Sequence, residues 1–239
     1  MAASLSRVLR GPIVAGGVRY ASVVTTVPGE HRSFHAWLTS LEGYEGQVAS
    51  LRFYPPRRAT HQAVHGPWEG AFGKLGLEPY THQAQALRLL DEGSNVVLAT
   101  PTASGKTLAY AVPALSGAPG AQTTLYLAPT KALAHDQLLK LQEMAASLES
   151  GHTVAAYDGD TPREGRAGLR EGAHVLLTNP DMLHFGILPF HQRWARFLGR
   201  LSLIVLDELH TYRGVMGTHV ANIVRRLLRI ARHHGARPQ

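Results

Sequence analysis

The chain has 239 residues, of which 44% are hydrophobic, so it is long and apolar enough for one sizeable domain with an extension. It has no cysteine, which excludes disulfides and thiolate metal sites, and no apolar run of about eighteen residues that would predict a membrane span. The net charge of +7 and the pI near 10.0 favour a polyanionic partner such as nucleic acid. A cysteine-free chain fits a reducing compartment, and we expect a cytoplasmic protein.

The N-terminal residues 1–29 contain three arginines, no acidic residue and many small residues. This composition resembles a transit peptide, which would direct the chain to an organelle. The interpretation that we favour is a flexible tail, because Gly11-Pro12 and Gly16-Gly17 would interrupt an amphipathic helix. We therefore expect three parts, namely a tail over residues 1–29, an extension over residues 30–66 and a main domain over residues 67–239.

Strands and helices alternate along the main domain, a pattern typical of an α/β fold with a parallel sheet covered on both faces. The expected strands are continuous apolar runs, as doubly covered strands are, and ligands in such sheets bind where the strands end. We expect strands over residues 95–100, 123–128, 153–157, 175–178 and 201–206. We expect helices over residues 30–44, 68–75, 81–90, 108–115, 132–148, 163–169, 180–185 and 215–232.

The loop after the first expected strand ends in Gly105-Lys106-Thr107 and is followed by a helix, which is the arrangement of a phosphate-binding loop. Backbone N–H groups and the helix N-terminus would surround nucleotide phosphates, Lys106 would reach the β- and γ-phosphates, and the Thr107 hydroxyl would hold Mg²⁺. The loop departs from the usual pattern, because Thr100 replaces a glycine and Pro101 removes an N–H. The alternative is an ordinary strand-turn-helix connection.

Adjacent acids, Asp207 and Glu208, follow the last expected strand. Asp207 can bind Mg²⁺ beside the phosphates, and Glu208 can polarise the water that attacks the γ-phosphate. The alternative is a solvated acidic turn. Upstream of the loop, Gln83 carries an amide that both donates and accepts, which suits the edge of adenine.

Two further strand ends carry polar residues at the start of a helix. Thr130 and Lys131 follow one strand, and Thr178, Asn179 and Asp181 follow another. These groups either contact the phosphate backbone of a nucleic acid or serve as helix caps. Four arginines lie near the C-terminus, namely Arg225, Arg226, Arg229 and Arg232. We interpret them as part of a solvated helix face in preference to a DNA contact.

The order of these motifs resembles the first RecA-like lobe of superfamily 2 DEAD/DEAH-box helicases, in particular the YprA/MrfA group related to the fungal Hrq proteins. The resemblance covers roughly residues 51–239. It implies a P-loop NTPase fold and an ATP-dependent motor, with Mg²⁺, that moves 3′ to 5′ on single-stranded DNA, in preference to RNA, in DNA repair. The motifs that carry it are Gln83, Ala103 to Thr107, Ala128 to Leu133, Tyr157 to Pro162, Thr178 to Leu183, and Asp207 to His210.

The resemblance implies a role for each motif residue. Lys106, Asp207 and Glu208 would carry ATP hydrolysis, His210 would couple the site to the second lobe, and Thr107 and Asp207 would bind the metal. The nucleic acid would contact Thr130, Lys131, Thr178, Asn179 and Asp181. The nucleotide would contact Tyr80, Gln83, Thr102, Ala103, Ser104, Gly105, Lys106 and Thr107.

The family also has a second RecA-like lobe, which supplies an arginine to the ATP site in cis or in trans. No second strand-helix series follows in this sequence, so we expect a truncated lobe that is inactive when isolated. The alternative is a non-catalytic module that binds ATP and nucleic acid. A P-loop kinase or GTPase is disfavoured, because neither an acceptor site with a lid nor an Asn-Lys-x-Asp motif is visible.

Overall fold

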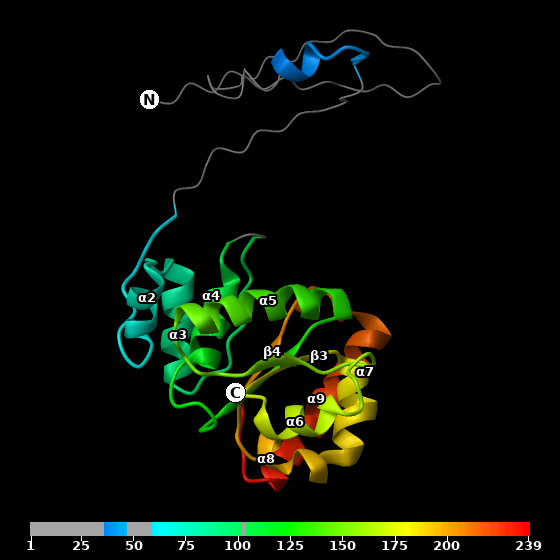
Figure 1. The fold of residues 1–239 in the computed structure, drawn as a ribbon. Helices are drawn as coiled ribbons and strands as arrows, with labels where there is room; N and C mark the ends of the chain where they lie inside the picture. Colours follow the sequence, from blue (N-terminus) through cyan, green and yellow to red (C-terminus); the bar gives the residue numbers. More distant parts are fainter. Residues whose placement is uncertain (1–35, 47–58, 102–103) are drawn as a thin grey trace. The chain divides into compact units, whose positions relative to one another are not determined.

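A computed structural model of the chain describes residues 36–46, 59–101 and 104–239, and its contacts divide the chain into two units, residues 1–58 and 59–239 (Figure 1). In the first unit, residues 36–39 form a helical turn, whereas residues 40–44, which we also expected to be helical, form turns, a bend and irregular structure. The expected tail lies outside the described residues. None of the helices in the described part of the chain combines the length and the hydropathy that a membrane span requires.

The second unit is built around a four-stranded parallel sheet with the order β2-β3-β1-β4 (Figure 1). In the register, Leu125 of β1 lies opposite Leu176 of β3 and Ile204 of β4. Four of the expected strands are confirmed to within two residues at each end. Their bounds are Thr123–Leu127 for β1, Val154–Ala156 for β2, Val175–Thr178 for β3 and Leu201–Leu206 for β4.

Helices cover both faces of this sheet, with α4 and α5 on one side and α6, α8 and α9 on the other (Figure 1). The helices have the following bounds: α2 Glu69–Leu75, α3 Thr81–Asp91, α4 Lys106–Leu115, α5 Lys131–Ser147, α6 Gly165–Gly172, α7 Pro180–Met182, the π-helix η1 Leu183–Ile187, the 3₁₀-helix η2 Leu188–Trp194, α8 Ala195–Leu198, the 3₁₀-helix η3 Leu209–Thr211 and α9 Gly214–His233. The helix expected over residues 180–185 is α-helical only in its first three residues.

Side chains alternate between two cores along the central strands. Leu125 and Leu127 of β1 pack with Trp194 and Leu227 in one core, whereas Tyr126 between them packs with Leu141 of α5 in the other. Because a strand points successive side chains to opposite faces, a strand that is buried on both faces must be apolar throughout. The sheet covered on both sides confirms the expected α/β class.

The strand expected over residues 95–100 is wrong, because the structure assigns no strand there and Val97 is 76% exposed. A strand requires a hydrogen-bonded neighbour. Within the described residues, the edge of β4 that faces away from β1 is bonded to Gln239, whose N–H donates to the Ser202 carbonyl at 2.9 Å and whose carbonyl accepts from Ile204 N at 2.8 Å. The apolar run therefore has no ladder partner among the described residues.

The segment that precedes α2 bonds to the start of α3. The Thr81 N–H and hydroxyl donate to the Thr60 carbonyl at 2.9 and 3.0 Å, and Gln62 N donates to the Pro79 carbonyl at 3.0 Å. Val64 is buried with Phe72 of α2. The structural division after residue 58 thus differs from the boundary that we expected after residue 66, because these bonds join residues 59–66 to the second unit.

Candidate functional site

The expected phosphate loop turns into α4 at Gly105, whose φ is +77°. This left-handed conformation suits glycine, and a Cβ there would lie 2.7 Å from Gln83 Nε2. The ammonium of Lys106 donates to the carbonyls of Thr100 at 2.7 Å and Pro101 at 3.1 Å. The loop therefore folds over the Lys106 ammonium, with the hydroxyls of Thr100 and Ser104 2.7 Å apart. Thr102 and Ala103 lie outside the described residues.

Gln83 joins α3 to this loop from a fully buried position. Its Nε2 donates to the Gly105 carbonyl at 2.7 Å, and its Oε1 accepts from Tyr80 N at 2.8 Å. The Tyr80 ring lies between those of His61 and His82, with centroids 4.9 and 5.8 Å away. The expected contacts of Gln83 and Tyr80 with adenine stay predictions, and the geometry gives Gln83 the role of fixing the loop to α3.

Asp207 directly follows β4, and its carboxylate accepts from two donors. The Glu208 N–H donates to its Oδ1 at 2.9 Å, and the hydroxyl of Tyr126 in β1 donates to its Oδ2. Burial raises the pKa of Tyr126 well above its usual value, so this hydroxyl stays protonated at neutral pH. Asp207 N also donates to the Leu127 carbonyl at 3.0 Å, which fixes the carboxylate at the end of the sheet.

A second tyrosine, Tyr110 of α4, packs beside Tyr126. Their ring centroids are 5.5 Å apart, and the Tyr110 hydroxyl donates to Oε1 of Gln137 in α5 at 3.1 Å. Burial, supported by the charge of Asp207, raises the pKa of Tyr110 to about 12. The ring pair thus packs α4, the helix that follows the phosphate loop, against the strand whose tyrosine holds Asp207.

The oxygens of Thr107 and Asp207 fit Mg²⁺, which prefers oxygen ligands and keeps several waters or phosphate oxygens in its shell. The described residues contain no group of three or more His, Cys, Asp or Glu side chains that could hold a metal ion. A magnesium ion at Thr107 and Asp207 would therefore depend on nucleotide phosphates and water for its other ligands.

Glu208 directs the chain away from the sheet through a left-handed backbone with φ of +47°. Such a conformation costs a non-glycine residue about 1–2 kcal/mol. The turn into η3 is supported by the Thr211 hydroxyl, which donates to the Glu208 carbonyl at 2.8 Å. The Glu208 carboxylate lies 3.2 Å from Nδ1 of His210, so these two expected site residues are neighbours.

Thr130 and Lys131 lie at the start of α5, next to β1. The Thr130 hydroxyl accepts from Leu133 N at 3.3 Å, so Thr130 caps the helix, which is the alternative to a phosphate contact that the sequence left open. The Lys131 ammonium lies 2.8 Å from Oδ2 of Asp160, and this hydrogen bond raises the pKa of the lysine. Both partners are solvent-accessible, so phosphate oxygens could compete for the ammonium.

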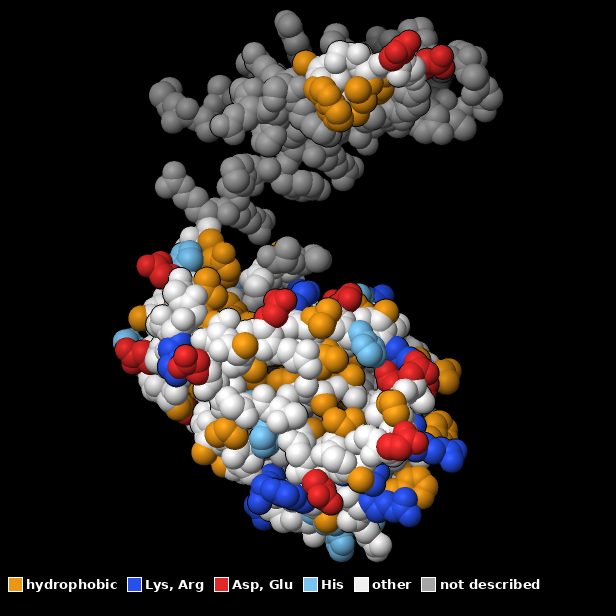
Figure 2. All heavy atoms as spheres, in the orientation of Figure 1, with side chains coloured by type: hydrophobic (Ala, Val, Ile, Leu, Met, Phe, Trp, Pro, Cys, Tyr) orange, Lys and Arg blue, Asp and Glu red, His pale blue; other side chains and the backbone are white. Residues whose placement is uncertain are grey.

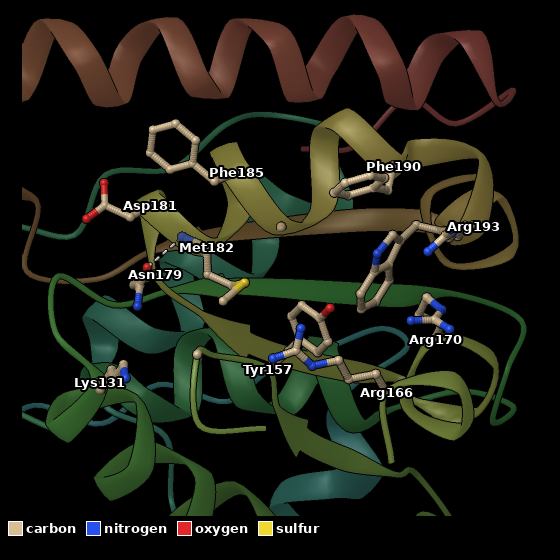
Figure 3. A pocket seen from close by; sticks show the side chains of 13 residues that line it. Lys131, Tyr157, Arg166, Arg170, Asn179, Asp181, Met182, Phe185, Phe190 and Arg193 are labelled. Carbon is tan, nitrogen blue, oxygen red and sulfur yellow. Dashed lines mark hydrogen bonds between the residues drawn. The ribbon is translucent and has the colours of Figure 1, made fainter. Parts of the chain in front are cut away.

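Three expected site residues at the end of β3 differ in exposure, since one is buried and two are accessible. Thr178 is buried and its hydroxyl donates to the Tyr157 carbonyl at 2.6 Å, so its side chain is structural. Asn179 accepts from Met182 N at 2.8 Å and thereby caps α7. Asn179, Asp181 and Lys131 lie at one end of the same pocket (Figure 3). Their contacts with nucleic acid stay predictions.

The sequence analysis missed Tyr126, whose hydroxyl donates to Asp207, and Tyr110, whose ring lies beside that of Tyr126. Both lie in apolar segments, where a tyrosine ring is expected to be part of the core. Tyr212, beyond the acids, was also missed, and burial together with the charge of Asp207 raises its pKa to about 12. Only the tertiary structure reveals that the Tyr126 hydroxyl contacts Asp207 and that the charge of Asp207 acts on Tyr110 and Tyr212.

Residues 80–236 match the family model described as DEAD/DEAH box helicase. The chain belongs to the DEAD/DEAH box helicase family. It is 42% identical over 213 residues to the ATP-dependent helicase YprA of Bacillus subtilis, a match that covers 87% of this chain and 28% of YprA. It is 40% identical over 217 residues to the ATP-dependent helicase HRQ1 of Saccharomyces cerevisiae, covering 87% of this chain and 20% of HRQ1.

Solved helicase structures agree with the sequence comparison. The crystal structure of the DUF1998 helicase MrfA bound to DNA and AMPPNP matches with a TM-score of 0.72 at 44% identity, covering 77% of this chain and 27% of MrfA. A hypothetical ATP-dependent RNA helicase from Sulfolobus tokodaii, at 21% identity and a TM-score of 0.55, shares the fold. The chain is a first RecA-like lobe of the YprA/MrfA-related helicases and spans about a quarter of the length of these relatives.

Proposed function

We propose that this chain is the ATP-binding motor lobe of an ATP-dependent DNA helicase or translocase. The observation that carries the proposal is the hydrogen bond from Tyr126 to Asp207, together with the ring pair of Tyr126 and Tyr110, which packs the helix of the phosphate loop against the strand beside Asp207. The names of YprA and HRQ1 as ATP-dependent helicases, and the DNA and AMPPNP bound to MrfA, support it.

In this proposal each motif residue has a chemical task. The Lys106 ammonium exchanges the carbonyls of Thr100 and Pro101 for β- and γ-phosphate oxygens. Thr107 and Asp207 would hold Mg²⁺, which would supply charge neutralisation at the phosphate oxygens. Glu208 orients the attacking water and accepts its proton, and His210 contacts Glu208 at the surface where a second lobe would close.

A second RecA-like lobe, in cis or in trans, is part of the proposed mechanism. Phosphoryl transfer in this class relies on an arginine from outside the lobe, whose loss costs a factor of about 10³–10⁵ in rate. We therefore expect the isolated chain to bind ATP with negligible turnover. A non-catalytic module that binds ATP and nucleic acid is the alternative, and it predicts no gain in turnover when a second lobe is supplied.

The nucleic acid in this proposal is single-stranded DNA, whose backbone passes Thr130, Lys131, Asn179 and Asp181, with Thr178 supporting this surface from the core. Phosphate contacts position a strand without reading its sequence. The 3′-to-5′ direction and a role in DNA repair rest on the resemblance to the YprA/MrfA group.

Binding of a fluorescent ATP analogue to wild type and to Lys106→Ala tests the ATP site. We expect the variant to lose about tenfold or more in affinity, because charge-assisted hydrogen bonds to phosphate contribute about 1.5–3 kcal/mol. The matched control is Lys140→Ala, which removes an exposed lysine from α5. Equal affinity of wild type and Lys106→Ala, with both proteins folded by circular dichroism, would refute the assignment.

A further inference from the structure

A pocket of about 600 Å³ extends from the expected nucleic-acid contacts toward α6 and η2 (Figure 3). Lys131, Asn179 and Asp181 line one end, Arg170 and Arg193 line the other, and Arg166 lies between them beside Tyr157. The arginines belong to none of the helicase motifs. The pocket is thus longer than the surface that the motif residues define.

Two exposed phenylalanines line this pocket. Phe185 is 67% exposed and Phe190 is 50% exposed, whereas most large apolar side chains of the lobe are buried. Phe185 belongs to the π-helix η1, a rare element that occurs frequently at functional sites. Below them, Tyr157 and Trp194 are buried with their rings edge to face and their centroids 4.8 Å apart. The pocket therefore combines a rigid aromatic floor with accessible aromatic rings.

Two of the three arginines lie close to aromatic rings of the pocket. The guanidinium carbon of Arg193 lies 5.5 Å from the centroid of Phe190, and that of Arg166 lies 5.5 Å from the centroid of Tyr157. The ion pairs found among residues 59–101 and 104–239 include none of Arg166, Arg170 and Arg193. Their charges are thus not neutralised by carboxylates in the described chain.

We propose that this pocket, the base pocket, takes an unstacked nucleobase of the single strand whose backbone passes Lys131 and Asn179. The base lies against Phe185 and Phe190, and the guanidinium groups of Arg166, Arg170 and Arg193 meet the next phosphate. Aromatic rings with a positively charged groove are the combination that binds single strands, because every base has a π-face. The inference rests on the proposed function, since it adds a base contact to the proposed backbone contacts.

The test compares two strands of the same length and charge. One is a single-stranded thymidine oligonucleotide of about ten nucleotides, and the other is the same backbone with every base removed. Fluorescence anisotropy measures the affinity of each strand for the chain. We expect wild type to prefer the thymidine strand by about tenfold, the ratio to which ~1.4 kcal/mol of stacking corresponds.

Phe185→Ala/Phe190→Ala should bind the two strands equally, with the affinity for the abasic strand unchanged from wild type. The matched control is Leu139→Ala/Val215→Ala, which removes two side chains that are 62% and 89% exposed on α5 and α9. This control should keep the full preference for bases.

Three results would overturn the inference. Equal affinity of wild type for both strands would contradict the proposed base contact and leave the proposed function intact. An equal loss for both strands in the phenylalanine variant would show that the two rings do not contact a base. No measurable binding of either strand to wild type at low salt would instead contradict the proposed function, and the base pocket with it.

Discussion

The side chain of Tyr126 projects from β1, and its hydroxyl donates to Asp207, which follows the neighbouring strand β4. The raised pKa of Tyr126, which burial causes, ensures that the group remains a donor across the neutral range. A donor fixed in this way holds one carboxylate oxygen of Asp207 and leaves its remaining lone pairs for a metal ion. In the proposed Mg²⁺ site, Tyr126 is therefore a positioning residue.

Tyr126→Phe should weaken binding of a fluorescent ATP analogue in the presence of Mg²⁺ by about tenfold, the loss typical of removing an outer partner of a metal ligand. In EDTA the affinity should match that of wild type, because Tyr126 is not expected to contact the nucleotide. The variant should also lose about 1 kcal/mol of unfolding free energy in urea.

The matched control for this prediction is Ser147→Ala, which removes a hydroxyl that bonds within α5. It should leave binding unchanged in both buffers. If Tyr126→Phe lowered affinity equally with and without Mg²⁺, the positioning role would be contradicted.

At the scale of elements, the junction of α3, the phosphate loop and α4 depends on Gly105. Its positive φ and the contact with Gln83 exclude a Cβ, and Gln83 in turn bonds to the N-terminus of α3. The orientation of the phosphate loop is thus coupled to α3 through one buried amide.

Gly105→Ala should lower the unfolding free energy in urea by about 1–2 kcal/mol or more, because alanine is strained at positive φ and displaces Gln83. It should also weaken binding of the ATP analogue. The control is Gly73→Ala in α2, where no atom lies within 4 Å of an added Cβ and the helix should gain about 0.5–1 kcal/mol. Destabilisation by both substitutions to the same degree would contradict the special role of Gly105.

The elements that the sequence predicted best are those with a local cause. The strands over residues 123–127, 175–178 and 201–206 are apolar runs, and Thr130 and Asn179 cap the helices that follow two of them. The run over residues 95–100 is also apolar, but it has no hydrogen-bonded neighbour among the described residues and forms no strand. A strand forms only where another strand can bond to it, so the composition of one segment does not show whether such a partner exists.

At the scale of the whole molecule, the net charge of +7 favours a polyanionic partner. On the face seen in Figure 2, groups of Lys and Arg side chains lie around α6 and α8, with hydrophobic side chains and some Asp or Glu side chains among them. Because α6 carries Arg166 and Arg170 of the proposed base pocket, we expect the polyanion to bind beside this helix. Binding to a polyanion releases counterions, so its strength depends on salt.

The logarithm of the affinity for a thymidine oligonucleotide should fall linearly with the logarithm of the salt concentration. Lys131→Ala should reduce the slope by about 0.7, the value for one phosphate contact on a single strand. Lys140→Ala, the control on the same helix, should leave the slope at the wild-type value. Identical slopes for Lys131→Ala and wild type would show that Lys131 contacts no phosphate.

The sequence by itself determined the α/β class, the order of the motifs and the family, because these follow from local periodicity and from short segments such as Gly105-Lys106-Thr107 and Asp207-Glu208. The tertiary structure alone decided which polar groups are accessible. It buried Thr178 and Gln83, placed Tyr126 against Asp207, and gathered Phe185, Phe190 and the arginines around one pocket. These contacts join residues far apart in the chain, and only packing across the sheet and between helices brings such residues together.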